Sequence, residues 1–141
     1  MQEDLVTFYF IIYTALCSLY ITAMITRAVP KLPFIDKKQT IEFYAGGLGF
    51  TLQSDYGNYV IMNFAEAELH FFSYPELERT KSDFMIYLRV NKNIDDLYEA
   101  LQKNNIDIHP NGKLEDKPWR QREFSIIDPN GTLLTFGQAV N

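Results

Sequence analysis

The chain is poor in the residues that most often build cross-links and metal sites. Cys17 is its only cysteine, which excludes an internal disulfide and any cysteine-rich metal site. The only histidines are His70 and His109. Basic residues are also few: 13 Lys and Arg stand against 18 Asp and Glu, for a net charge of −5. This balance argues against nucleic-acid binding, because phosphate backbones attract basic surfaces.

Motifs of catalysis are missing as well. The sequence has no glycine loop of the phosphate-binding kind and no convincing Ser-His-Asp order. Its acidic pairs, such as Glu115 and Asp116, are typical of solvated surface charge. We therefore predict no catalytic residues.

Apolar and aromatic residues are abundant in this chain. Its 141 residues fit one domain, and 47% of them are hydrophobic. Aromatic residues make up 15%, which is more than a small core needs. Two interpretations follow: the aromatic residues line a ligand pocket, or they fill the core of a β-rich fold.

The N-terminal segment 1–26 is expected to stand apart from a domain at 27–141. No charged residue occurs from Leu5 to Thr26, a length that could span a bilayer as a helix. Three interpretations stay open: a mis-assigned start with translation from Met24, a membrane anchor, or an extra packed helix. If the segment inserts, the basic residues that follow it, beginning with Arg27, would keep the domain cytoplasmic. Without insertion we expect a cytoplasmic protein with no membrane partner.

The remainder reads as two halves of the same order, β-α-β-β-β, which predicts an α+β fold. In the first half we expect a helix at 37–46 and strands at 28–35, 50–53, 59–64 and 68–72. In the second half we expect a helix at 94–103 and strands at 84–90, 106–108, 124–127 and 132–136. A polar loop would span 109–118. Because one such curved sheet cannot close a core alone, the two units should pack together.

Two motifs identify the family that this pattern resembles. The first is Asp128-Pro129-Asn130-Gly131, a tight turn between two strands, in which proline presets φ and glycine accepts a positive φ. The second runs from Phe43 to Phe50 as Phe-Tyr-x-x-x-Leu-Gly-Phe. Over about residues 28–138 the chain resembles the vicinal-oxygen-chelate superfamily of glyoxalases, bleomycin resistance proteins and ring-cleaving dioxygenases. The resemblance implies a curved mixed sheet forming a cup, and a homodimer with ligand clefts near the subunit interface.

The resemblance also locates the positions at which enzymes of this superfamily hold a divalent metal. The matching residues here are Val29, His70, Met85 and Thr135. Only His70 is a good ligand, and a divalent site normally needs three protein ligands. We therefore expect no metal and no cofactor. The alternative is a metal-dependent glyoxalase or dioxygenase-type enzyme that uses His70.

The predicted ligand site lies on the concave face of the cup. Period-two alternation places Glu68, His70 and Phe72 on one face, and the same reasoning aligns Met85 with Tyr87. The chain resembles bleomycin resistance proteins further in Leu69-His70-Phe71-Phe72 and in Trp119, nine residues before the turn. The predicted ligand-binding residues are Glu68, His70, Phe72, Met85, Tyr87, Trp119, Arg122 and Thr135.

The expected function is metal-independent sequestration of a small aromatic or glycopeptide-like antibiotic, which would confer antibiotic resistance. Arg120 and Arg122 depart from the family pattern and favour an anionic or carbonyl ligand. Two structural alternatives remain open. Trp119 could plug the dimer seam, and Arg122 could form an ion pair with Glu123.

Overall fold

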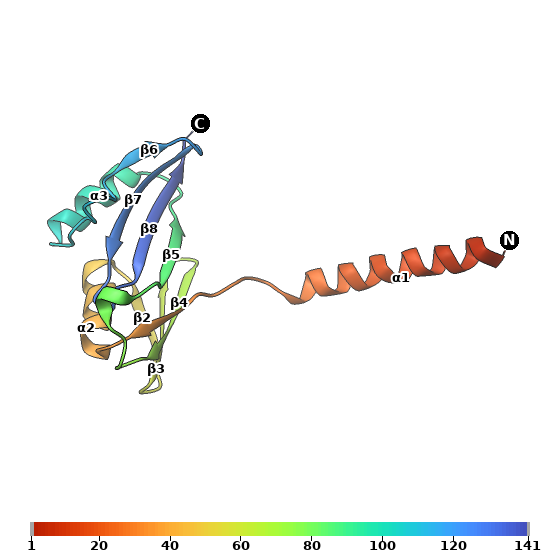
Figure 1. Ribbon diagram of the computed structural model, residues 1–141, viewed down its shortest axis with the longest axis horizontal. Coiled ribbons are helices and arrows are strands. Elements are labelled where there is room, and N and C mark those ends of the chain that lie inside the picture. The colour runs from red at the N-terminus through yellow and green to blue at the C-terminus, as the bar shows by residue number, and fades with distance from the viewer. Residues whose placement is uncertain (1, 141) are drawn as a thin grey trace.

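A computed structural model describes residues 2–140, with side chains described for 4–17 and 24–140. The chain forms two four-stranded sheets, each with helices on one side, and a separate N-terminal helix (Figure 1). This confirms the predicted α+β class and the division into two similar halves.

The first sheet has the strand order β1-β4-β3-β2. Its strands are β1 (Lys31–Phe34), β2 (Thr51–Asp55), β3 (Tyr59–Phe64) and β4 (Ala67–Ser73). The only parallel pair is β1 with β4, because the long connection between them lets β1 run in the same direction as β4. β1 is shorter than the predicted strand 28–35, so Val29 lies before the sheet.

Between β1 and β2 the predicted single helix at 37–46 is two pieces. α2 (Lys37–Ile41) begins at Asp36, whose side chain accepts a hydrogen bond from the Gln39 N–H at 2.8 Å. It then widens into a π-helical stretch, η1 (Glu42–Gly47). Tyr44 of η1 is fully buried and packs edge-on against Phe71 of β4.

The second sheet repeats this arrangement with the order β5-β8-β7-β6. A short 3-10 turn, η2 (Arg79–Lys81), leads into it. The elements are β5 (Met85–Arg89), α3 (Ile94–Lys103), β6 (Glu115–Lys117), β7 (Gln121–Ile127) and β8 (Leu133–Ala139).

The predicted strand at 106–108 is wrong. Only Ile108 makes a single bridge, to Ile126, and the second strand of this half is β6, inside the segment predicted as a polar loop. Ile106 packs instead over Gly47 of the first half, where a glycine Cβ would lie 2.8 Å from its side chain. Ile106 therefore serves packing between the halves, while Ile108 bridges to β7 of its own half.

α2 and α3 lie on the same side of the two sheets, and α1 projects from the other side (Figure 1). Buried residues of alternate strand positions face the helices, as with Leu69 and Phe71 of β4 and Phe124 and Ile126 of β7. We call the opposite side of both sheets, which no helix of the domain covers, the open face. It is the surface on which the concave ligand site was predicted.

The Asp128-Pro129-Asn130-Gly131 turn forms as predicted, with Gly131 at φ +82° and its N–H donating to the Asp128 carbonyl. The turn is also a buried junction between the halves. Tyr44 donates its hydroxyl to Asp128 at 2.9 Å, and the Asn130 side chain accepts the Ile35 N–H at 2.8 Å. Burial raises the pKa of Asp128 above its ordinary value, and the hydrogen bonds that it accepts offset this in part.

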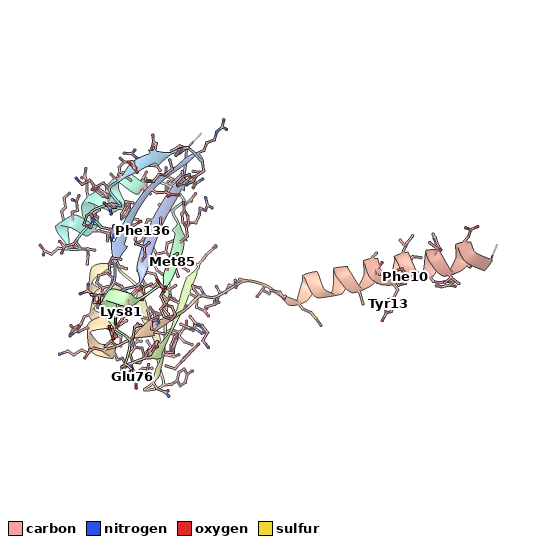
Figure 2. All side chains as sticks on the ribbon, in the orientation of Figure 1. Phe10, Tyr13, Glu76, Lys81, Met85 and Phe136 are labelled. Atoms are coloured by element: carbon pink, nitrogen blue, oxygen red, sulfur yellow. The ribbon has the colours of Figure 1, made fainter. Side chains whose placement is uncertain are left out.

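α1 (Gln2–Met24) is a continuous helix whose described side chains, residues 4–17, are exposed. Phe10 and Tyr13 project from it far from the sheets (Figure 2). Within the described part of the chain, no helix combines the length and hydropathy of a membrane span.

Candidate functional site

The open face of the first sheet carries a hydrogen-bonded chain centred on His70. Since Leu69 and Phe71 are buried toward α2, alternation turns Glu68, His70 and Phe72 to the open face. All three are only partly exposed.

His70 is fully engaged through both ring nitrogens. Nε2 lies 2.8 Å from Glu68 Oε1, and Nδ1 lies 2.8 Å from the Tyr59 hydroxyl. An ionised Glu68 carboxylate only accepts, so Nε2 donates to it; in the neutral form of the ring, Nδ1 is then the acceptor for the Tyr59 O–H. Glu68 is also ion-paired with Arg27, from the segment before β1. A metal could bind His70 only by displacing one of these partners.

The open face of the second sheet is organised by a carboxylate. Glu123 Oε1 accepts hydrogen bonds from the Tyr87 hydroxyl at 2.7 Å and from the Trp119 indole N–H at 2.8 Å. Glu123 is only 6% exposed, yet it forms no ion pair with the described residues. The carboxylate thus holds two aromatic side chains, and a cation lies over each ring: Arg89 at 5.4 Å from the Tyr87 centroid and Lys117 at 5.9 Å from that of Trp119.

Tyr87 and Trp119 are fixed differently by this carboxylate. The Tyr87 ring lies against β8, where Gly137 leaves room: a Cβ at Gly137 would be 1.6 Å from the Tyr87 hydroxyl oxygen. Burial, and then the hydrogen bond to Glu123, raises the pKa of Tyr87 to about 12. Trp119 is 60% exposed; its indole N–H is anchored by Glu123, and the Lys117 ammonium lies 5.9 Å from its ring centroid.

The other predicted residues of this sheet, Met85 and Thr135, lie further along its strands than Glu123. Met85, the residue of β5 labelled in Figure 2, is 68% exposed. Thr135 of β8 faces Ser125 of β7, with their hydroxyl oxygens 2.9 Å apart. Both predicted positions are therefore on the open face.

Arg122 is placed elsewhere. Arg122 lies two residues before Phe124 in β7 and therefore points to the helix side of the sheet. There it forms ion pairs with Asp95 of α3 at 2.7 Å and with Asp116 of β6 at 2.9 Å. These partners raise the pKa of Arg122 above its ordinary value. The predicted Arg122–Glu123 pair is wrong, because adjacent strand residues face opposite sides of a sheet.

The predicted residues thus form two groups, one on each sheet. Phe72 is the link between the sheets: its ring lies 6.1 Å from that of Phe84, the residue before β5. Of the four superfamily metal positions, His70 is paired with Lys31 and not with Val29, and Thr135 with Tyr87 and not with Met85. No group of three or more His, Cys, Asp or Glu side chains suited to a metal ion occurs among the described residues.

Two residues of the site escaped the sequence analysis. Glu123 was interpreted as a partner of Arg122, although its alternation with Ser125 already indicated the open face. Tyr59 gave no signal of its own, because its contact with His70 depends on the register in which Tyr59 lies opposite Phe72 and Ile61 opposite His70.

Comparison with known proteins gives a consistent result. The sequence model of the Glyoxalase/Bleomycin resistance protein/Dioxygenase superfamily matches residues 30–136. Bleomycin resistance proteins of Geobacillus stearothermophilus and of Staphylococcus aureus strain MRSA252 are each 30% identical over 129 residues, covering 81% of this chain and 97% of theirs.

Solved structures agree with the sequence comparison. A crystal structure of a bleomycin-binding protein complexed with bleomycin aligns with a TM-score of 0.73 and 27% identity, covering 82% of this chain and all of that one. A bleomycin resistance determinant encoded on transposon Tn5 aligns with a TM-score of 0.74 and 27% identity, covering 83% of this chain and 100% of its own. The arrangement of the two sheets is therefore that of these binding proteins.

Proposed function

Because this chain belongs to the glyoxalase/bleomycin resistance protein/dioxygenase superfamily, we propose that it is a metal-independent binding protein of the bleomycin resistance type. Its ligand would be a bleomycin-like glycopeptide or another small aromatic antibiotic, held without chemical change and thereby kept from its target. Support comes from the bleomycin resistance proteins that this chain matches over nearly their whole length. A structural neighbour that is complexed with bleomycin adds to it.

The observation that carries the proposal is the Glu123 carboxylate on the open face. It is nearly buried, forms no ion pair with the described residues, and orients Tyr87 and Trp119. A flat aromatic group could stack on the exposed Trp119 ring, and a cationic group could compensate Glu123. This revises the expected ligand charge: Arg122 is turned away and neutralised, so the second sheet offers a carboxylate where the sequence indicated an arginine.

The proposed contact residues are those of the open face. From the first sheet they are Glu68, His70 and Phe72; from the second they are Met85, Tyr87, Trp119, Glu123 and Thr135. Since Arg122 lies on the helix side, it is not among them.

We further propose that two copies pair through their open faces. Met85 at 68%, Trp119 at 60% and Tyr87 at 45% exposure are large side chains of the open face left in water on a single chain. Concentrated apolar exposure of this kind marks a binding surface. In a homodimer, the open faces of two chains would enclose the ligand between them.

The domain would be residues 27–141, with the binding residues all inside it, and the protein would act in the cytoplasm. The free, exposed thiol of Cys17 is compatible with a reducing compartment.

The test is ligand binding by the full-length protein. Trp119 is the only tryptophan, so its fluorescence reports on the site directly. We expect metal-free bleomycin, or its copper complex, to quench Trp119 at one ligand per subunit, with no stoichiometric metal in the purified protein by elemental analysis. Glu123→Gln removes the charge and should weaken binding by roughly tenfold, as loss of a charged interaction does.

Glu99→Gln is the matched control, because Glu99 is exposed on α3 and its one ion pair among the described residues is with Lys103. It should bind like the wild type. No quenching together with a stoichiometric metal would instead support the enzyme alternative built on His70. Equal weakening by both substitutions would show that Glu123 has no specific role.

A further inference from the structure

A cavity of about 400 Å³ lies at the junction of the two halves, and none of its lining residues belongs to the open-face site. Four separate segments form its walls: η1, η2, the loop after α3, and the end of β7 with the following turn. Apolar side chains line much of it, namely Phe43, Ile106, Ile108 and Ile127. Its volume is within the range of small-molecule sites.

The walls of this cavity are fixed by backbone contacts. The loop after α3 is attached to β7: Ile108 bridges Ile126, and the His109 N–H donates to the Ser125 carbonyl at 2.8 Å. η2 is held against the turn at Gly131, where a Cβ would lie 2.1 Å from the Arg79 carbonyl oxygen. The cavity therefore keeps its shape without a ligand, which lowers the entropic cost of binding.

Two opposite charges line the same cavity and are both free. Arg79 and Asp107 are exposed, and neither side chain forms a hydrogen bond or ion pair with the described residues, including each other. A guanidinium matches a carboxylate in a two-pronged geometry, and a carboxylate accepts from an ammonium. An apolar wall flanked by one free cation and one free anion is complementary to a zwitterion with an apolar body.

We propose that this cavity is a second ligand site that binds a small zwitterionic molecule with an apolar side chain, of the chemical class of the apolar amino acids. Arg79 binds the carboxylate and Asp107 the ammonium group, while Phe43, Ile106 and Ile127 contact the side chain. This site is independent of antibiotic binding on the open face.

The experiment is a titration of the uniformly ¹⁵N-labelled full-length protein with three probes, followed by NMR. L-Phenylalanine carries both charges, N-acetyl-L-phenylalanine lacks the ammonium, and phenethylamine lacks the carboxylate. We expect L-phenylalanine to cause saturable shifts of the Ile106, Ile108 and Ile127 amides. Each of the other probes should bind about tenfold more weakly, because one charged hydrogen-bonding group is lost.

Two substitutions assign the charges. Arg79→Gln should remove the preference for L-phenylalanine over phenethylamine, and Asp107→Asn its preference over N-acetyl-L-phenylalanine. Lys92→Gln, which removes an exposed charge at the opposite end of α3, should change neither. The proposal is overturned if L-phenylalanine gives no saturable shifts at these amides, if wild-type protein binds all three probes equally, or if both charge substitutions leave the preferences intact.

Discussion

Replacing Glu123 separates the two roles that its carboxylate combines, supplying charge and accepting hydrogen bonds. Glu123→Gln keeps a carbonyl oxygen that can still accept from Tyr87 and Trp119 but removes the charge. Glu123→Ala removes both. Comparing the two variants shows whether charge or hydrogen bonding orients the aromatic pair.

The expected loss of stability in Glu123→Ala depends on how exposed Tyr87 and Trp119 are. A hydrogen bond to a charged group contributes about 1.5–3 kcal/mol when its partner has no substitute. Tyr87 at 45% and Trp119 at 60% exposure can both turn to water, so most of this is recovered when Glu123 is lost. Removing the carboxylate also relieves a nearly buried charge. We therefore expect Glu123→Ala to change the free energy of unfolding by only about 1 kcal/mol.

The sensitive measurement is the pKa of Tyr87, read from a ¹³C-tyrosine NMR titration. In the wild type this pKa is about 12, raised first by burial and then by Glu123. Both variants should lower it toward the ordinary value of 10.0, Glu123→Ala the most, without reaching it while the ring stays packed over Gly137.

The raised pKa of Tyr87 also determines how its contribution to stability changes with pH. Because the folded-state pKa is raised, the contribution of Tyr87 to stability is present below pH 10.0 and is lost as the pH rises toward about 12. A wild-type Tyr87 that titrates with the exposed tyrosines, or a pKa that is the same in all three proteins, would refute the Glu123–Tyr87 contact.

Two further predictions concern the buried turn. Gly131→Ala places a Cβ 2.1 Å from the Arg79 carbonyl oxygen at φ +82°, whereas the Cβ of the control Gly57→Ala meets nothing within 4 Å at φ +86°. Thermal unfolding should show a loss of stability of about 1 kcal/mol for Gly57→Ala and of at least about 3 kcal/mol for Gly131→Ala. Equal losses would contradict the close packing at Gly131. Since the folded-state pKa of Asp128 is raised, its stabilising contribution is present below pH 3.8 and is lost as the pH rises. Urea denaturation should therefore show that the stability of the wild type relative to Asp128→Asn increases as the pH is lowered. Asp55→Asn is the control of opposite sign, because hydrogen bonding to Lys37 lowers the pKa of Asp55. The stability of the wild type relative to Asp55→Asn should decrease as the pH is lowered.

The elements with strong local patterns were predictable from sequence alone. β3 and α3 have the predicted bounds because alternation and helical spacing are clear and turn residues flank them. β6 was missed because Glu115–Lys117 has no apolar alternation; it exists only through its pairing with β7. The segment 106–108 has a strand-like composition, but Ile106 is needed against Gly47.

Sequence alone predicted those residues of the site whose position depends only on the alternation of side chains along a strand. The placement of His70 and Phe72 with Glu68 needed only period two, and the same rule, applied consistently, would have exchanged Arg122 for Glu123. Tyr59 could not be found in this way, since its contact with His70 depends on the register between two strands. Register is set by turns and by packing across the sheet, which a single sequence reports weakly.

The buried turn determines the geometry of the binding face although it lies outside it. The two groups of open-face residues belong to different sheets, and their relative orientation depends on how the halves are joined. That junction includes Tyr44 with Asp128, and Asn130 with the Ile35 N–H, all from the turn and the first helical region. A buried polar network tolerates few alternative arrangements, because each unsatisfied group is costly. The geometry of the open face can thus be traced to a turn that lies outside that face.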